Sequence, residues 1–277
     1  MGSRPRSGPA DPVLECVVNI SEGRRHDLIE TVARAAGPEL LDVHTDPDHH
    51  RSVLTLVGED APRAVAAAAV LALDLTSHRG AHPRMGVVDV VPFVPLGSAT
   101  MTDAVAARDR FAAWAAAQLA VPCFCYGPER TLPEVRAGAF ATLAPTVGPD
   151  RPHPTAGAMA VGARPVLVAY NLWLRRPDLD TARSIARAVR SSSVRALGLA
   201  VGDHVQVSMN LIDPAVTGPA DVYDAVGAAA DIERAELVGL VPQAVLDATD
   251  PTDWADLDLA PDRTIEARLR ARGWAAG

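Results

Sequence analysis

The order of secondary-structure elements repeats along this chain, and that repeat constrains the fold more than any other feature. Apolar runs and helical spacings in the first half predict the order β-α-β-β-α-β, which is that of a ferredoxin-like unit. The second half repeats the element order without repeating individual residues. We therefore predict an α+β fold of two ferredoxin-like (βαββαβ) subdomains with a cleft between them, over residues 13–164 and 165–277.

The expected elements are bounded by polar, Gly-containing or Pro-containing turns. The first half comprises a strand at 13–20, a helix at 27–36, strands at 40–43 and 53–57, a helix at 61–75 and a strand at 87–94. The second half comprises a strand at 166–173, a helix at 179–189, strands at 194–200 and 205–212, a helix at 220–230 and a strand at 237–241. The remaining expectations are a disordered lead-in at 1–12, a helix at 102–119, a strand at 123–126, a Pro- and Gly-rich stretch at 127–157, and a last helix at 264–272.

Composition limits the class of protein. The formal net charge is −8 and the pI about 5.4, which argues against a nucleic-acid partner. All 26 basic residues are arginines, so Schiff-base and P-loop lysine chemistry is excluded. Three cysteines fit a reducing cytosol, and Cys123 and Cys125 read as buried residues on one strand face rather than metal ligands. The apolar run 66–75 is too short to span a membrane. We expect a cytoplasmic enzyme without a metal.

The densest polar signal is His78-Arg79-Gly80-Ala81-His82-Pro83-Arg84-Met85-Gly86, between an expected helix and an expected strand. The Gly and Pro residues restrict the backbone and would place His82 reproducibly. An imidazole suits general base catalysis near neutral pH without a large pKa shift. The alternative from composition alone is a solvated polar loop, and the two readings have equal weight.

A second polar segment runs from His44 to Arg51. Its His and Asp residues are common metal ligands, but their spacing matches no metal signature. We therefore favour a polar hairpin turn, in which His49 and His50 point to opposite faces. Arg51 opens the next strand and could face the cleft, where it would bind a carboxylate with two hydrogen bonds.

Three further groups could line a binding site. The segment Gly148, Pro149, Asp150, Arg151, Pro152, His153, Pro154, Thr155, Ala156 and Gly157 is stiffened by its prolines, so it could form a pocket wall, a linker between subdomains, or both. Asn19, Ser21 and Glu22 end the first strand; they could orient a ligand, although Ser21 is better explained as a cap of the next helix. Gln206, Ser208 and Asn210 alternate and so share one strand face, which suggests a cleft wall or an exposed sheet face.

Together these segments resemble the formiminotransferase family. The matching stretches are ECVVNISEG (15–23), LLDV (40–43), HRSV (50–53), HRGAHPRMG (78–86), VDVVPFVP (88–95), RTLPEVRAGAF (130–140), VGARPVLVAYN (161–171), VQVSMNL (205–211) and ELVGLVPQAVLDA (236–248). The resemblance covers almost the whole chain after residue 12. The HPRMG and VGLVP motifs, in this order and spacing, are specific.

The resemblance implies transfer of a formimidoyl group from N-formimidoyl-glutamate to tetrahydrofolate, a co-substrate, in histidine degradation. It implies that His82 is the catalytic residue and that residues 148–157 bind folate in the cleft. Arg51, Arg84 and Arg164 are the expected anchors for the carboxylates of donor and folate, with Asn19, Gln206, Ser208 and Asn210 as further substrate contacts. It also implies a homodimer and requires no metal.

The chain departs from the family pattern at three places. His44 stands where the family commonly has an acidic residue, and Ala81 replaces the acidic residue usually found just before the catalytic histidine. The connection 126–131 is several residues shorter than in the animal enzymes. The first two changes, at His44 and Ala81, bear on the identity of the donor more than on the reaction class. Two alternatives therefore stand beside the transferase: a related folate-dependent enzyme with another formyl or formimidoyl donor, and a non-catalytic module that binds a small ligand.

Overall fold

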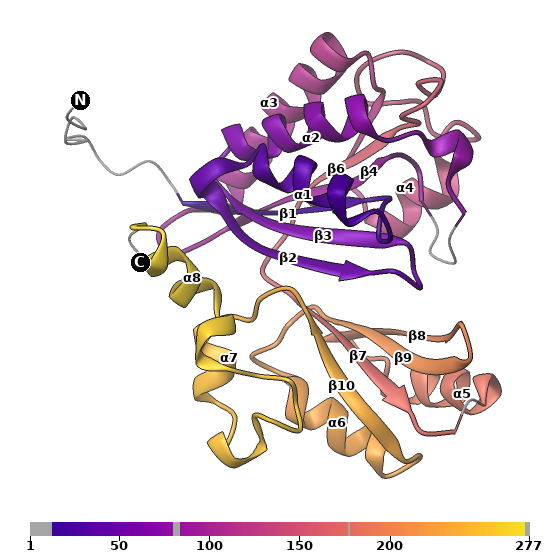
Figure 1. The fold of residues 1–277 in the computed structure, drawn as a ribbon, viewed down its shortest axis with the longest axis vertical. Helices are drawn as coiled ribbons and strands as arrows, with labels where there is room; N and C mark the ends of the chain where they lie inside the picture. Colours follow the sequence, from indigo (N-terminus) through magenta and orange to yellow (C-terminus); the bar gives the residue numbers. More distant parts are fainter. Residues whose placement is uncertain (1–12, 80–83, 177, 275–277) are drawn as a thin grey trace.

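A computed structural model describes residues 13–79, 84–176 and 178–274, which form two β-sheets (Figure 1). The strands of the six-stranded first sheet lie in the order β2-β3-β1-β4-β6-β5, and those of the four-stranded second sheet in the order β10-β7-β9-β8. The first sheet contains β1 (Leu14–Ile20), β2 (Leu40–Asp46), β3 (Arg51–Val57), β4 (Val88–Pro95), β5 (Cys123–Tyr126) and β6 (Met159–Ala163). The second contains β7 (Val168–Leu174), β8 (Val194–Val201), β9 (His204–Leu211) and β10 (Ile232–Val238).

Both sheets contain the predicted ferredoxin-like unit. In the first sheet β2, β3, β1 and β4 pair antiparallel, and in the second sheet β10, β7, β9 and β8 do the same in the equivalent order. The prediction of an α+β protein built from two such units is confirmed. The predicted lead-in at residues 1–12 lies outside the described residues.

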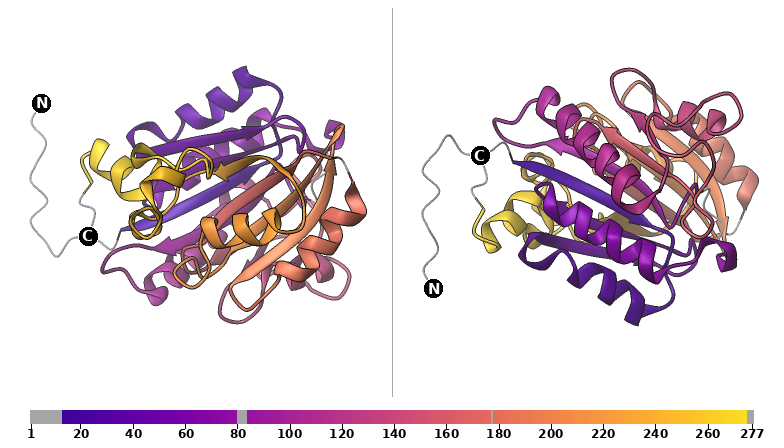
Figure 2. Two further views of the ribbon diagram at one scale, coloured as in Figure 1. Left: turned by 90° about the horizontal axis from the view of Figure 1, so that it is seen from below. Right: turned by 90° about the horizontal axis from the view of Figure 1, so that it is seen from above.

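The described helices pack on both sheets, most of them on the outer faces. They are α1 (His26–Arg34), α2 (Asp60–Ala72), α3 (Met101–Leu119), α4 (Leu132–Gly138), α5 (Leu179–Val189), α6 (Pro219–Gly227), α7 (Gln243–Asp247) and α8 (Ile265–Ala271). Helices α1, α2 and α3 pack on the outer face of the first sheet, and α5 and α6 on the outer face of the second (Figures 1 and 2). Alternation along the strands leaves the other face of each sheet toward the opposite unit.

The first half contains elements that the sequence patterns did not predict. Strands β5 and β6 pair parallel and extend the first sheet beyond β4, but β6 was not expected because its residues follow the Pro-rich segment directly. Helix α4 lies inside the stretch expected to be irregular. Its signal was present: Thr131 and Glu134 form a capping box, and Pro133 lies in the first turn.

The second half differs from expectation at its end. Strand β10 spans Ile232–Val238 rather than 237–241, because polar residues of its inner face broke the apolar run. Helix α7 was not predicted. The terminal helix α8 was predicted, and it packs back onto the first sheet through Leu41, Val57, Leu240, Ile265 and Leu269. The end of the chain therefore joins the two units.

The structure also bears on the cysteines, on membrane-spanning helices and on groups that could bind a metal. Cys123 and Cys125 are buried free thiols on one face of β5, as predicted. Burial raises the pKa of Cys123 to about 12, so its thiol is not a nucleophile near neutral pH. None of the described helices is long and apolar enough to cross a membrane. Across the described ranges, we find no group of three or more His, Cys, Asp or Glu side chains placed to hold a metal ion.

Candidate active site

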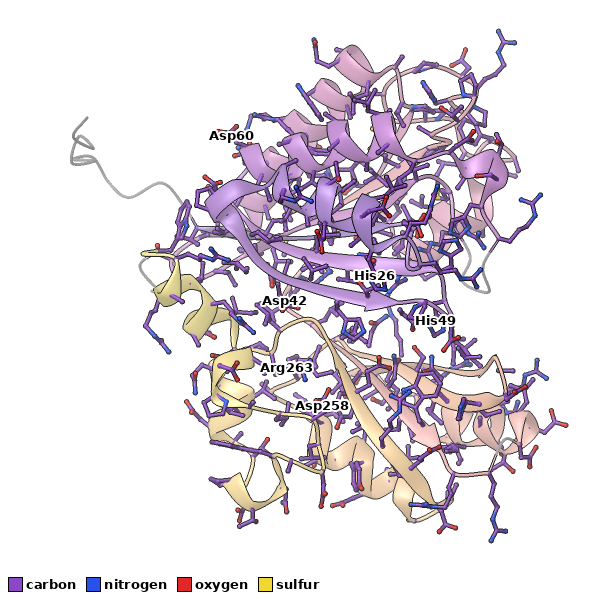
Figure 3. All side chains as sticks on the ribbon, viewed as in Figure 1. His26, Asp42, His49, Asp60, Asp258 and Arg263 are labelled. Carbon is purple, nitrogen blue, oxygen red and sulfur yellow. The ribbon has the colours of Figure 1, made fainter. Side chains whose placement is uncertain are left out.

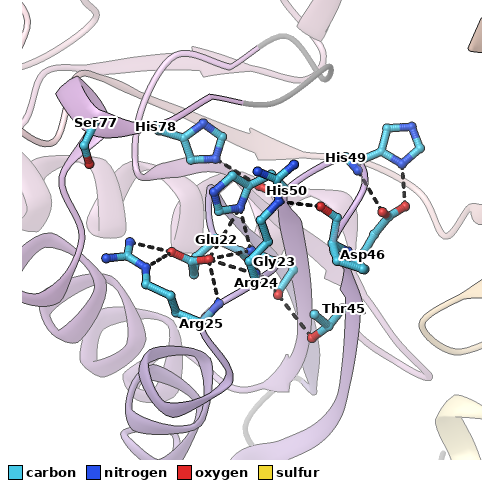
Figure 4. A network of polar contacts seen from close by, with 12 residues as sticks. Glu22, Gly23, Arg24, Arg25, Thr45, Asp46, His49, His50, Ser77 and His78 are labelled. Atoms are coloured by element: carbon cyan, nitrogen blue, oxygen red, sulfur yellow. Dashed lines mark hydrogen bonds and ion pairs between the residues drawn. The ribbon is translucent and has the colours of Figure 1, made fainter. Parts of the chain in front are cut away.

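A buried carboxylate organises the chain where β1 ends. The Glu22 side chain is fully buried and accepts hydrogen bonds from the backbone N–H groups of Gly23, Arg24 and Arg25, at 2.8–3.0 Å. Arg25 adds a salt bridge with an N–O distance of 2.5 Å (Figure 4). Burial alone would raise the pKa of Glu22, but these donors outweigh it and hold the pKa below its ordinary value. Glu22 therefore stays ionised and fixes the turn before α1.

The turn at Glu22 holds the first of two stacked histidines. The backbone N–H of Gly23 donates to Nδ1 of His50 over 3.0 Å. The rings of His50 and His78 stack with centroids 4.1 Å apart, and Nε2 of His78 donates to the carbonyl of His50 over 3.0 Å (Figure 4). Nδ1 of His78 contacts the guanidinium of Arg84. Burial is the largest cause that lowers the pKa of both histidines, so their neutral forms are favoured.

This arrangement closes the loop that contains the predicted catalytic residue. His78 and Arg84 flank residues 80–83, and their side chains contact each other. His82 itself, with Ala81, lies outside the described residues, so its catalytic role stays a prediction. The choice between a catalytic loop and a solvated polar loop stays open; the flanking residues His78 and Arg84 are held by contacts with the β2–β3 turn and with each other.

The neighbouring histidine points the other way, as predicted for His49 and His50. Asp46 accepts the backbone N–H groups of Asp48 and His49, at 2.9 and 2.8 Å, and contacts Nδ1 of His49. Nε2 of His49 lies 3.2 Å from the side-chain nitrogen of Gln206 on β9. Figure 3 labels His49 at the tip of the β2–β3 hairpin, beside the second unit. The segment 44–51 is therefore the predicted polar hairpin.

Arginines surround one buried carboxylate beside this loop. Asp89 is 1% exposed and accepts from the backbone N–H of Met85 at 2.7 Å and from Arg136 of α4 at 2.5 Å. Asp89 also raises the pKa values of Arg51 and Arg84, whereas burial, the larger cause, lowers both. Arg136 thus forms a salt bridge with Asp89, and Arg51 and Arg84 lie within electrostatic reach of the same carboxylate. Arg136 was missed by sequence reasoning because α4 was not predicted.

The predicted folate-binding stretch ends against the same loop. Its first residues are exposed, whereas Ala156 and Gly157 are buried. The carbonyl of Ala156 accepts a hydrogen bond from the N–H of Val87 at 3.0 Å. Gly86 and Gly157 form an isolated antiparallel β-bridge. At Gly157 φ is +72°, and a Cβ there would lie 2.3 Å from the carbonyl oxygen of Met85, so only glycine allows this approach. The structure thus brings the segments 84–87 and 148–157 together.

Ser21 has a different partner from the one expected. Its hydroxyl donates to the carbonyl of Gly86 at 2.8 Å, and its N–H donates to the carbonyl of Val87 at the same distance. The expectation that Ser21 caps the next helix is wrong, because its side chain is buried against this loop and cannot reach the helix N-terminus. Ser21 instead fixes the end of β1 to the segment that precedes β4.

The inner face of the second sheet presents the predicted polar stripe. Gln206, Ser208 and Asn210 share the face that lies away from the α5 and α6 core. Gln206 is fully buried and its amide oxygen has no hydrogen-bond partner within the described ranges, whereas Asn210 is exposed. Leu197 on neighbouring β8 shares this face and is 57% exposed. Part of this face is therefore open to solvent.

A second contact joins the two inner faces. Oε1 of Glu236, on β10, lies 3.3 Å from Nε2 of His44, while Oε2 accepts from Asn171 at 3.0 Å and from Trp173 at 2.8 Å. Burial raises the pKa of Glu236, but the hydrogen bonds from His44, Asn171 and Trp173 outweigh it and lower the pKa to about 2. These contacts of Glu236 with His44, Asn171 and Trp173 were missed, because the spacing of the residues in sequence gives no sign of a shared contact.

Not every predicted substrate contact lies at this end of the first sheet. Asn19 does lie there, near the Glu22 end of β1 on its inner face, opposite Val53 of β3, and it donates to the carbonyl of Val17 at 3.0 Å. Arg164 follows β6 and donates to the carbonyl of Pro165. It lies near Glu15, at the opposite end of β1 from Glu22. The structure therefore groups Arg51 and Arg84 and separates Arg164 from them.

Comparison with known proteins gives consistent matches. A family model for the N-terminal subdomain of the formiminotransferase domain matches residues 13–164. Glutamate formimidoyltransferase of Streptococcus pyogenes serotype M1 is 37% identical over 232 residues, covering 73% of this chain and 78% of that protein. The Thermoplasma acidophilum enzyme of the same name is 33% identical over 272 residues, covering 84% and 89%. Formimidoyltransferase-cyclodeaminase of Sus scrofa is 35% identical over 278 residues, covering 85% of this chain and 51% of that protein.

Proposed function

Because the chain belongs to the formiminotransferase family, we propose that it transfers a formimidoyl group from N-formimidoyl-L-glutamate to N5 of tetrahydrofolate and releases glutamate. The observation that carries this proposal is the group of arginines beside the loop 78–86. Arg136 forms a salt bridge with the buried carboxylate of Asp89, and Arg51 and Arg84 lie close enough for that carboxylate to oppose the lowering of their pKa values by burial. Guanidinium groups suit a donor with two carboxylates and a folate with a glutamyl tail.

The proposed reaction needs one proton acceptor that becomes a donor. N5 of tetrahydrofolate attacks the amidine carbon, and His82 takes the N5 proton as the tetrahedral intermediate forms. The bond from that carbon to the glutamate nitrogen then breaks, and the imidazolium of His82 protonates the departing nitrogen. The contact between His78 and Arg84 supports this role, because it restrains both ends of the short segment that contains His82.

The other predicted contacts have specific roles in this proposal. Gln206 is buried at the contact with His49, whereas Ser208 and Asn210 extend the same face of β9 toward solvent and would contact the substrate. Asn19, near the Glu22 end of β1, would contact the substrate there, and Arg164 would contact the more distant part of a long folate. Residues 148–157 would form the folate wall, supported by their pairing with residues 84–87. We further propose that the protein acts in the cytoplasm and that it forms a homodimer.

The direct test is product analysis. Purified protein is incubated with N-formimidoyl-L-glutamate and tetrahydrofolate, and glutamate and formimidoyl-tetrahydrofolate are measured by mass spectrometry. We expect equal amounts of both products, and no glutamate release without tetrahydrofolate. N-formyl-glutamate in a parallel reaction tests the alternative donor, which the replacement of an acidic residue by His44 motivates. Folate binding without turnover of either donor would support a non-catalytic binding module.

The folate wall has its own test. Replacing Pro149, Pro152 and Pro154 together with Ala raises the entropy cost of ordering this segment. We expect calorimetric titration with a reduced folate to show weaker binding, while thermal unfolding stays close to wild type because these prolines are exposed. A Kd unchanged within about twofold, roughly 0.4 kcal/mol, would mean that the segment only links the subdomains.

A further inference from the structure

Two adjacent histidines at the β2–β3 turn bind to different parts of the molecule. His50 has φ +54°, a left-handed conformation that turns the chain sharply. His49 is directed to the second sheet, where it meets Gln206, and His50 is directed to the turn at Gly23 and to His78. One peptide bond therefore separates a contact with β9 from a contact with the loop 78–86.

The hydrogen bonds determine which nitrogen of His49 has the proton. Asp46 is an ionised acceptor, since hydrogen bonds from His49 outweigh burial and lower its pKa. Nδ1 of His49 must therefore donate to Asp46, and Nε2 is left to accept from the amide of Gln206. Gln206 is fully buried, so water cannot replace this contact. His49 is thus fixed as the Nδ1–H tautomer by one group from each subdomain.

The neighbouring histidines have the opposite tautomer. Nδ1 of His50 accepts from the backbone of Gly23, so its proton is on Nε2. His78 donates with Nε2 to the carbonyl of His50, and its Nδ1 faces the guanidinium of Arg84. Any shift of the hairpin at His49 moves the carbonyl and ring of His50, and both of these hold His78.

We propose that His49 is a positioning residue: its contact with Gln206 transmits the placement of the second subdomain, through His50 and His78, to the loop that contains the catalytic histidine. The proposal rests on the proposed transferase function for its kinetic consequence alone. Substrate contacts on β9 would then be held at the correct distance from the proton acceptor in the other subdomain. A displacement of about 1 Å at such a group lowers kcat by about 100-fold.

The first test measures coupling without turnover. Protein labelled with ¹⁵N-histidine shows the Nε2–H signal of His78, assigned by its loss in His78→Gln. We expect this signal to weaken or shift in Gln206→Ala, which lies in the other subdomain, and in His49→Ala. It should be unchanged in the control His26→Ala, which replaces an exposed histidine at the start of α1. A signal unaffected by both Gln206→Ala and His49→Ala would overturn the coupling, whatever reaction the protein catalyses.

The second test separates positioning from simple support of the fold. We expect His49→Ala to lower kcat about 30-fold, with KM for both substrates within about threefold. His49→Gln, whose amide can donate to Asp46 and accept from Gln206, should restore at least a third of kcat. Equal loss in both variants, or a loss in KM alone, would overturn the positioning role. An inactive wild type would refute the transferase proposal, and the histidine signals would still decide the coupling.

Discussion

Strand β1 has a buried glutamate near each end, and the two differ in electrostatics. Glu22 is fully buried beside the histidine and arginine groups, yet three backbone N–H groups and Arg25 keep its pKa low. Glu15, at the other end, is 4% exposed and has a pKa raised to about 7 by burial, which Arg164 opposes and Glu266 reinforces. Burial alone therefore does not set the charge; the donors around each carboxylate do.

The difference separates the two ends of the first sheet by role. The Glu22 end is held by directional hydrogen bonds that fix a turn, a hairpin and the loop 78–86. The Glu15 end lies near the last helix, α8, because Glu266 of that helix is close enough to raise the pKa of Glu15. We interpret the first as the end that performs chemistry and the second as a packing junction between the units.

The largest expected effect comes from removing the carboxylate of Glu22. Glu22→Ala leaves the backbone N–H groups of Arg24 and Arg25 without their acceptor, removes one of the two acceptors of Gly23, and should lower the free energy of unfolding by about 3 kcal/mol. Urea unfolding measures this, with Glu30→Ala as the control, because Glu30 forms an exposed ion pair worth less than about 0.5 kcal/mol. A loss below about 1 kcal/mol for Glu22→Ala would remove the contrast between the two ends.

Glu15→Gln should have the opposite sign and a smaller effect. The folded state binds a proton at Glu15 more tightly than the unfolded state, whose pKa is near 4.5. The stability that this protonation gives is full below pH 4.5 and lost as pH rises through about 7. Glu15→Gln should therefore raise the free energy of unfolding by at most about 3 kcal/mol at pH 8 relative to the wild type, and by much less at pH 5. Equal changes at both pH values would contradict the raised pKa.

The arginines at the Glu22 end should affect binding more than the chemical step. We expect Arg84→Ala and Arg51→Ala each to raise KM for the anionic donor about tenfold, or about 1.4 kcal/mol, with a smaller change in kcat. Arg24→Ala is a matched control, because its Nε donates to the carbonyl of Pro47 in an exposed contact. Steady-state kinetics with both substrates gives the answer. Unchanged KM values in both variants would exclude these two arginines from the site.

Sequence patterns predicted the repeated unit and much less of the site. Strand alternation and helical spacing depend on local order, so both ferredoxin-like units and the shared face of Gln206, Ser208 and Asn210 could be predicted. The contacts of Glu236 with His44 and of Arg136 with Asp89 join residues far apart in the sequence. Local periodicity says nothing about such pairs. The prediction for Ser21 was wrong for the same reason, since its hydroxyl donates a hydrogen bond to a residue 65 positions away.

The measurement that tests the account most directly is kcat of His82→Ala with N-formimidoyl-L-glutamate and tetrahydrofolate. General acid–base catalysis contributes about 10²–10⁴-fold, so we expect a loss of that size. KM values and the unfolding midpoint should stay near wild type, because the groups that hold the loop, His78 and Arg84, are retained. A variant that keeps more than about a tenth of the wild-type kcat would contradict the placement of the proton transfer at the Glu22 end of the first sheet.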